Sequence, residues 1–104
     1  MIVELRDYHV TTGKLPELVR LYETEGSAIQ QEYLGTFVGA FTTDVGELST
    51  YTHIWAYESH ADREARRARL QADVRWQAFL AKIQPLIHTQ RNRIMIPTSF
   101  SPLR

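Results

Sequence analysis

The spacing of the hydrophobic residues changes repeatedly along this chain, and the order of those changes limits the fold more than any other feature. Alternating apolar residues indicate a β-strand, whereas apolar residues three or four positions apart indicate a helix. Turn formers such as Gly13, Gly35 and Pro85 separate the segments, and Gly26 is expected to bend the first helix. The segments are, in order, a strand over 2–10, a helix over 14–34, strands over 36–43 and 49–58, helical stretches over 59–72 and 76–83, and a strand over 91–97.

This β-α-β-β-α-β order is that of the ferredoxin-like split βαβ fold. We therefore expect residues 1–104 to form a single α+β domain, in which a four-stranded antiparallel sheet carries its helices on one face. A chain of this length buries only about two-thirds of the surface that its unfolded form exposes. It can build one modest core, so a deep ligand pocket is expected to need a partner subunit.

The composition excludes several classes of function. Twelve Lys and Arg residues balance twelve Asp and Glu residues, and no segment has the basic excess that binds nucleic acid. Cysteine is absent, which excludes disulfides, thiol catalysis and cysteine-ligated metals. No histidine pair has metal-binding spacing, and no glycine-rich phosphate loop or serine nucleophile elbow occurs. We expect neither a metal nor a cofactor.

No part of the sequence indicates a membrane protein. No stretch approaches the roughly 20 apolar residues of a membrane helix. The first residues, MIVELR, lack the positive region and apolar run of a signal peptide. We therefore expect a cytoplasmic protein without membrane insertion.

The two faces of the predicted sheet differ in character, and the bare face is expected to be an interface. We expect the helices to cover the aliphatic face, which carries Val3, Leu5, Ile54, Ala56, Ile94 and Ile96. The opposite face is aromatic and charged, with Glu4, Arg6, Tyr8, Tyr51, His53, Trp55, Tyr57, Arg91 and Arg93. Because an aromatic face of this size is seldom left in water, the sequence predicts a homodimer joined through the sheet.

His53 is the candidate catalytic residue, because it lies in the middle of a strand on the aromatic face. An imidazole at this position could act as a general base, bind a haem iron or make a structural hydrogen bond. The structural interpretation is about as probable as a ligand-facing one, and catalysis is the smaller share of the latter.

Two arginines and three aromatic residues are candidate ligand-binding residues. Arg6 and Arg93 are expected to converge and to favour a bound carboxylate or phosphate. A bridge between Glu4 and Arg6 is an equally good alternative that would leave no binding site. The rings of Tyr8, Tyr51 and Trp55 could stack on a flat ligand, although large rings more often serve as core or interface.

A run of arginines, Arg63, Arg66, Arg67 and Arg69, could form an anion-binding patch. Acidic residues, among them Asp62, lie between and beside them. We therefore interpret the run as a solvated helix face held by pairs three or four residues apart.

Three motifs follow one another along the chain: Glu4-Leu5-Arg6 with Tyr8, then His53-Ile54-Trp55-Ala56-Tyr57, and then Asn92-Arg93-Ile94. They lie in segments 4–26, 34–59 and 91–103, which cover nearly the whole chain. In these segments the chain resembles the NIPSNAP family of the dimeric α+β barrel superfamily, and the three motifs are the most specific parts of the resemblance. The resemblance implies a homodimer in which two sheets face each other to form a barrel.

The resemblance implies no single reaction. Proteins of the same fold include cofactor-independent monooxygenases, haem-degrading enzymes and small isomerases, but a shared fold does not assign a reaction. Our first hypothesis is a homodimer that binds or transforms a small hydrophobic or anionic molecule in a pocket beside the sheet. The second is a non-catalytic dimeric interaction module whose aromatic face is used in self-association.

Overall fold

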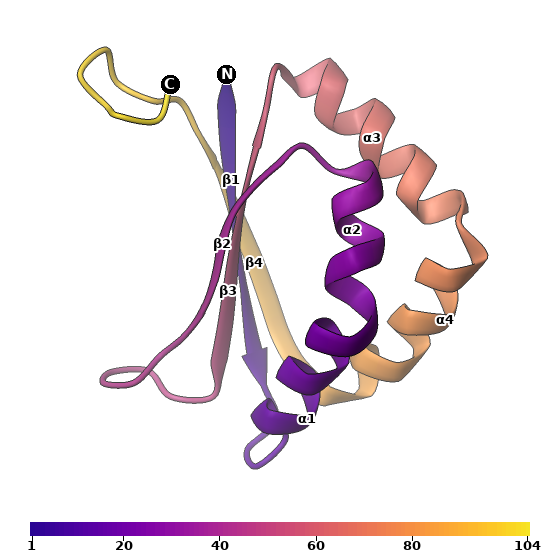
Figure 1. Cartoon of the computed structure of the whole chain (residues 1–104). Coiled ribbons are helices and arrows are strands. Elements are labelled where there is room, and N and C mark those ends of the chain that lie inside the picture. The colour runs from indigo at the N-terminus through magenta and orange to yellow at the C-terminus, as the bar shows by residue number, and fades with distance from the viewer.

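The computed structural model of residues 1–104 has two layers, an open four-stranded sheet and a set of helices on one of its faces (Figure 1). The elements are β1 (Ile2–Val10), α1 (Leu15–Leu21), the π-helical turn Tyr22–Gly26, α2 (Ser27–Tyr33), β2 (Thr36–Thr42), β3 (Thr50–Tyr57), α3 (His60–Ala72), α4 (Val74–Ile83), the 3₁₀ turn Gln84–Leu86 and β4 (Ile87–Met95). The predicted ferredoxin-like order is confirmed, with each helical segment divided in two. No helix is both long and apolar enough to cross a membrane.

The sheet is antiparallel, and its strand order β2-β3-β1-β4 puts β1 and β3 at the centre. On these two strands Glu4 lies opposite Trp55 and Arg6 lies opposite His53. On the other side of β1, Arg6 lies opposite Asn92 of β4. Directly opposed residues of antiparallel strands point to the same face. These five side chains therefore share one face of the sheet.

The helices cover the face opposite to the one that the sequence predicted. Glu4, Tyr8, His53 and Trp55 lie between the layers with at most 6% of their surface exposed. The open face instead carries Val3, Leu5, Asp7, Thr52, Ile54, Ala56, Arg91, Arg93 and Met95. The prediction of the faces was wrong because period-two alternation separates two faces without saying which one the helices cover.

Aromatic packing explains why the aromatic face is the covered one. Tyr22, from the π-helical turn, stacks on Tyr51 of β3 at 4.7 Å between ring centroids, and it meets Phe79 of α4 edge-on at 5.0 Å. Gly26 permits this arrangement, because a Cβ there would lie 2.3 Å from the Cζ of Phe79. The bend expected at Gly26 thus has a packing cause.

Strand β4 begins at Ile87, earlier than the predicted Arg91. It is an edge strand, and most of its residues are exposed on both faces. Its sequence therefore lacks the alternation that marks a half-buried strand. The helices leave this edge of the sheet largely uncovered, which opens a space between β4 and the helix layer.

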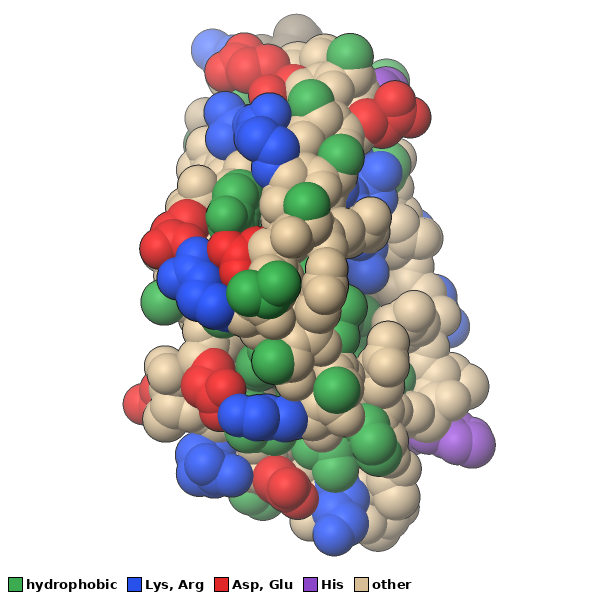
Figure 2. Space-filling model, turned by 90° about the vertical axis from the view of Figure 1, so that its right-hand side faces the viewer, with side chains coloured by type: hydrophobic (Ala, Val, Ile, Leu, Met, Phe, Trp, Pro, Cys, Tyr) green, Lys and Arg blue, Asp and Glu red, His purple; other side chains and the backbone are tan.

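Most of the large exposed apolar side chains lie away from the helix layer, and Val74 of α4 is an exception. They lie on the β2 edge, in the loop after β2 and on the C-terminal tail, at Val38, Phe41, Val45, Leu48, Ile96 and Phe100. Phe41 is 55% exposed and Phe100 is 84% exposed. The outer surface of the helices, by contrast, interleaves basic and acidic side chains (Figure 2).

Candidate functional site

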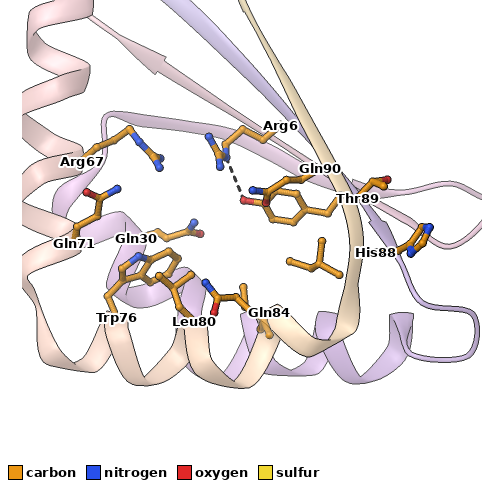
Figure 3. Close-up of a pocket in the computed structure, with 13 residues that line it drawn as sticks. Arg6, Gln30, Arg67, Gln71, Trp76, Leu80, Gln84, His88, Thr89 and Gln90 are labelled. Carbon is orange, nitrogen blue, oxygen red and sulfur yellow. Dashed lines mark hydrogen bonds between the residues drawn. The ribbon is translucent and has the colours of Figure 1, made fainter.

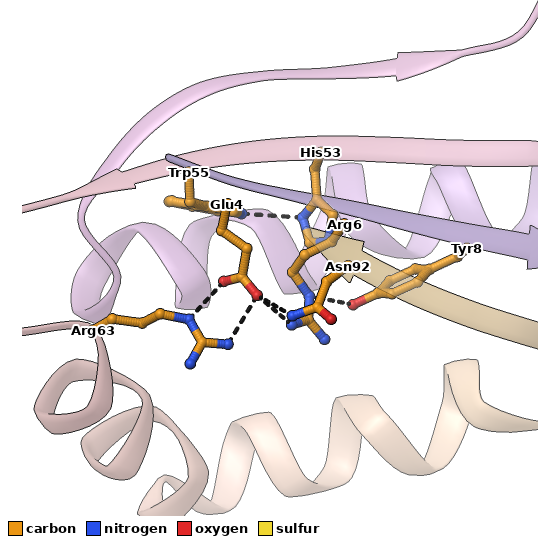
Figure 4. Close-up of polar contacts among 7 residues, drawn as sticks. All are labelled: Glu4, Arg6, Tyr8, His53, Trp55, Arg63 and Asn92. Carbon is orange, nitrogen blue, oxygen red and sulfur yellow. Dashed lines mark hydrogen bonds and ion pairs between the residues drawn. The ribbon is translucent and has the colours of Figure 1, made fainter. Parts of the chain in front are cut away.

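A buried carboxylate joins helix α3 to strands β1 and β4 (Figure 4). Glu4 has no exposed surface. Its oxygens accept hydrogen bonds from Nε and Nη2 of Arg63 at 3.0 and 2.8 Å. Arg6 Nη1 donates to it at 3.0 Å and Asn92 Nδ2 at 2.8 Å. The bridge between Glu4 and Arg6 considered above therefore exists, within a larger network.

The network keeps Glu4 ionised. Burial alone would raise the pKa of this carboxyl. The hydrogen bonds from Arg63 and Asn92 and the charges of Arg6 and Arg63 outweigh that effect, and they lower the pKa from 4.5 to about 2. The negative charge is thus present at any physiological pH, and two guanidinium groups share it.

Two arginines of helix α3 point inward, towards the sheet. The helix begins at Ser59, whose Oγ accepts a hydrogen bond from the backbone N–H of Asp62 at 3.1 Å. Arg63 and Arg67 are one turn apart and therefore lie on the same side of the helix. Arg63 reaches Glu4, and Arg67 lines a pocket beside it.

The remaining arginines of the run behave as the sequence predicted. Arg66 pairs with Asp62 at 2.9 Å, one turn away, and Arg69 is exposed. The interpretation as a solvated face is confirmed for Arg69, and the predicted pairing is confirmed for Arg66, which also donates to the backbone oxygens of Tyr33 and Leu34 at 3.2 and 3.4 Å. The interpretation was wrong for Arg63 and Arg67.

A pocket of about 410 Å³ lies between the sheet and helices α3 and α4 (Figure 3). Roughly 300 to 1,000 Å³ is usual for small-molecule sites. Arg6 and Arg67 lie at one end of it and Trp76 and Leu80 at the other. The lining also contains Tyr8, Gln30, Gln71, Ile83, Gln84, Ile87, His88, Thr89 and Gln90. All of its permanently charged side chains are arginines.

Tyr8 and Arg6 form a fixed pair on the sheet side of the pocket. Arg6 Nε donates a hydrogen bond to the Tyr8 hydroxyl oxygen at 3.1 Å. The phenol oxygen is the acceptor in this pair. Arg6 donates to Tyr8 through Nε and to Glu4 through Nη1, and its Nη2 has no partner in the chain.

Two further polar side chains point into the pocket without a partner (Figure 3). Arg67 is half-buried and makes no hydrogen bond or ion pair within the chain. Burial, and then the charge of Arg6, lower the pKa of its guanidinium. The side-chain amide of Gln30 also has no partner, although the residue is only 4% exposed. Both side chains line the open space of the pocket, so their donor groups are free to hydrogen-bond a ligand there.

His53 lies behind the pocket, and its side chain is fully buried. Its Nδ1 accepts a hydrogen bond from Trp55 Nε1 at 3.1 Å, which leaves the proton of the neutral ring on Nε2. Nε2 has no hydrogen-bond partner. Burial, and then the charge of Arg6, lower the pKa of His53 from 6.5 to about 3. The ring is therefore neutral at physiological pH.

The sequence profile of the NIPSNAP family matches residues 3–102 of the chain. The chain belongs to the NIPSNAP family. It is 32% identical over 103 residues to Protein NipSnap homolog 1 of Danio rerio, covering 99% of this chain and 36% of the relative. It is 33% identical over 104 residues to Protein NipSnap homolog 2 of Homo sapiens, covering 99% and 35%. The chain thus spans about a third of the length of these curated relatives.

Solved structures of the NIPSNAP family superpose closely on this chain. One from Agrobacterium tumefaciens gives a TM-score of 0.97 at 48% identity and covers 99% of this chain and 98% of its own. A second protein from that organism gives 0.98 at 45% identity and covers 100% of both. An antibiotic biosynthesis monooxygenase described as putative, from Nitrosomonas europaea, gives 0.71 at 11% identity over 93% of this chain and 98% of its own. This last likeness shows the fold alone.

The NIPSNAP fold separates the residues that the sequence selected as a site. Arg6 and Tyr8 line the pocket. Tyr51 and Trp55 are buried beside His53 and do not line it. Arg93 is on the open face of the sheet, so the expected convergence of Arg6 and Arg93 was wrong. The proposed catalytic role of His53 stays a prediction.

His88 and the acidic residues add no metal site to this NIPSNAP chain. The ring of His88 lies 6.3 Å from that of His9 and points away from the two arginines (Figure 3). No group of three or more His, Asp or Glu side chains is placed to hold a metal ion.

Arg63, Arg67 and Gln30 are among the residues of the pocket and its network that the sequence did not select as a site. A signal for the two arginines was present. They precede the buried Leu70 by seven and three residues, which puts them on the inner side of the helix. Gln30 directly follows the buried Ile29 in α2, but no comparable pattern marks its amide as unpaired.

Proposed function

We propose that this protein binds a small organic anion in the pocket between the sheet and helices α3 and α4, and that it acts as a homodimer joined through the open sheet face. The observation that carries the binding proposal is the charge balance beside the pocket. Arg6, Arg63 and Arg67 contribute three guanidinium charges, and Glu4 is the one carboxylate paired with them. Buried charges are costly unless they are paired, so an anionic ligand would stabilise this arrangement.

The other lining residues support an organic ligand over a bare inorganic ion. Trp76, Leu80, Ile83 and Ile87 form an apolar wall, which would bury a hydrocarbon or aromatic part. An anion with such a part would place its charge between the two arginines and its apolar body against α4.

Replacing Arg67 with glutamine tests the binding site. We expect the ligand-free R67Q variant to be at least as stable as the wild type, because the substitution removes a half-buried charge that burial and the charge of Arg6 disfavour. Phenyl phosphate, benzoate and succinate would each be added at constant ionic strength in a thermal-shift assay. An anion at about 100 times its Kd stabilises the folded state by about 2.7 kcal/mol, and R67Q should lose most of that gain.

The matched control is Arg69→Gln, which removes the same charge from an exposed position of the same helix. R69Q should keep the full response to the anions. Equal responses of wild type and R67Q to every anion tested would refute the pocket as the site.

A second copy of this chain is the proposed cover for the open sheet face. The exposed apolar residues Phe41, Ile96 and Phe100 lie on the β2 edge and on the tail, away from the helices. Exposed apolar surface of this kind commonly marks an interface. Ile54 and Leu5 of the central strands face the same side.

Light scattering with Ile54→Arg tests the dimer. We expect the wild type to have twice the 12.1 kDa mass of the chain at micromolar concentration, and I54R to be monomeric because it places a charge at the centre of the interface. Val74→Arg is the control, since Val74 is 74% exposed on the helix side. A wild-type mass of one chain would reject the dimer, and an I54R variant that remains dimeric would reject the open sheet face as its interface.

A further inference from the structure

We infer that the anionic group taken by the pocket is a tetrahedral dianion, such as the phosphate group of a monoester attached to an apolar body, in preference to a carboxylate. This inference rests on the proposed function, since it names the chemical class of the ligand in the same pocket. Three independent features of the pocket lead to it: the amount of uncompensated charge, the number of free donors and the position of the apolar wall.

The uncompensated charge amounts to two positive charges. Glu4 neutralises one of three guanidinium groups, and it is shared between Arg63 and Arg6 through the same oxygen, Oε2. Arg67 has no acidic partner at all. A monocarboxylate would leave one of these charges unbalanced, whereas a phosphate monoester carries close to two negative charges at neutral pH.

The free donors outnumber the acceptor positions of a carboxylate. All five N–H groups of Arg67 are free, as is the Nη2 group of Arg6. The amide of Gln30 adds a further donor group to the lining, beside Trp76. A phosphate group presents three terminal oxygens to such a set, and the planar fork of arginine binds it in a bidentate way.

The apolar wall defines the rest of the ligand. Trp76 and Leu80 of α4 lie across the pocket from the two arginines (Figure 3). Trp76 is held in place by stacking on Phe79 at 5.2 Å between ring centroids. An apolar or aromatic body on the phosphate would therefore contact this wall while its charged end lies between Arg6 and Arg67.

Titration calorimetry with phenyl phosphate, phenyl sulfate and benzoate at pH 7.5 tests the inference. Phenyl sulfate has the tetrahedral shape of phenyl phosphate but a single negative charge, and benzoate is a planar monoanion. We expect phenyl phosphate to bind at least about tenfold more tightly than either of the others, because it alone neutralises both positive charges. Inorganic phosphate, which lacks the apolar body, should bind more weakly than phenyl phosphate.

Two variants connect that preference to the pocket. R67Q should weaken the binding of phenyl phosphate by about tenfold or more, so that its affinity approaches that of phenyl sulfate. Gln71→Glu places a carboxylate one helical turn from Arg67 and should also suppress binding of the dianion. Circular dichroism spectra like those of the wild type would show that both variants are folded.

The possible results separate the inference from the proposed function. If benzoate or phenyl sulfate binds as tightly as phenyl phosphate, and R67Q weakens the binding of all three, the preference for a dianion is rejected. The proposed binding of an organic anion in the pocket is then retained. If none of the probes binds, or if R67Q changes none of the affinities, both are rejected.

Discussion

The substitution Glu4→Gln is expected to lower the free energy of unfolding by about 3–5 kcal/mol, the range for breaking a buried ion pair by removing one partner. Glu4 has no exposed surface and accepts four hydrogen bonds, from Arg63, Arg6 and Asn92. Glutamine keeps the size of the side chain but removes the charge. The guanidinium groups of Arg6 and Arg63 would remain beside it with no acidic partner.

The lowered pKa of Glu4 gives an independent value, of similar size, for the loss of unfolding free energy in E4Q. This pKa falls from 4.5 to about 2 on folding. A change of one in a pKa corresponds to about 1.4 kcal/mol, so the folded network favours the ionised carboxylate by about 3 kcal/mol. A folded domain has only about 5–15 kcal/mol of stability. The loss should therefore be visible as a fall of roughly 15 °C in the midpoint of thermal unfolding.

The measurement is chemical denaturation at pH 7 and fixed protein concentration, with Glu64→Gln as the control. Glu64 is exposed on α3 and forms no ion pair, so its substitution should change stability by no more than about 0.5 kcal/mol. If E4Q were as stable as E64Q, Glu4 would not be the group that holds α3 to the sheet.

The sequence was sufficient for the fold, because the order of the elements and the antiparallel sheet follow from local periodicity. It was not sufficient for the choice of the covered face. Both faces of the central strands contain large apolar side chains, such as Trp55 on one and Ile54 on the other. The choice is made by contacts between segments far apart in the chain, including Tyr22 on Tyr51.

Local sequence patterns also could not predict the whole candidate site, because distant segments form it. Arg6 and Tyr8 lie on one face of one strand and both line the pocket, and their role in binding a ligand stays a prediction. Arg67 was set aside because interleaved charges on a helix usually indicate solvent. Its spacing from the buried Leu70 puts it on the inner side of α3, but the pocket that it faces is formed by distant segments, including β4, and no local pattern in α3 predicts that pocket.

Stability should fall between pH 7 and pH 5 because of His53. The pKa of its ring is about 3 in the folded state and 6.5 when exposed. Below pH 6.5 the unfolded chain binds a proton that the folded chain does not, so the free energy of unfolding decreases as the pH falls. At about 1.4 kcal/mol per pH unit, the loss reaches about 2 kcal/mol at pH 5. It continues until the pH approaches 3.

The interval from pH 7 to pH 5 distinguishes the effect of His53 on stability from that of Glu4. The folded pKa of Glu4 is lowered, so its stabilising effect is complete above pH 4.5 and is lost as the pH falls towards 2. Urea unfolding at pH 7 and pH 5 therefore reports mainly on His53. The variant His53→Gln removes the titrating group and should make the two free energies nearly equal, whatever its effect on absolute stability.

The control is His60→Gln, at an exposed position at the start of α3. H60Q should retain the full loss of stability between pH 7 and pH 5. A loss of the same size in H53Q as in the wild type would mean that some other group drives the acid response. It would also mean that the ring of His53 can take up a proton without unfolding, which full burial among Tyr8, Tyr22 and Tyr51 should prevent.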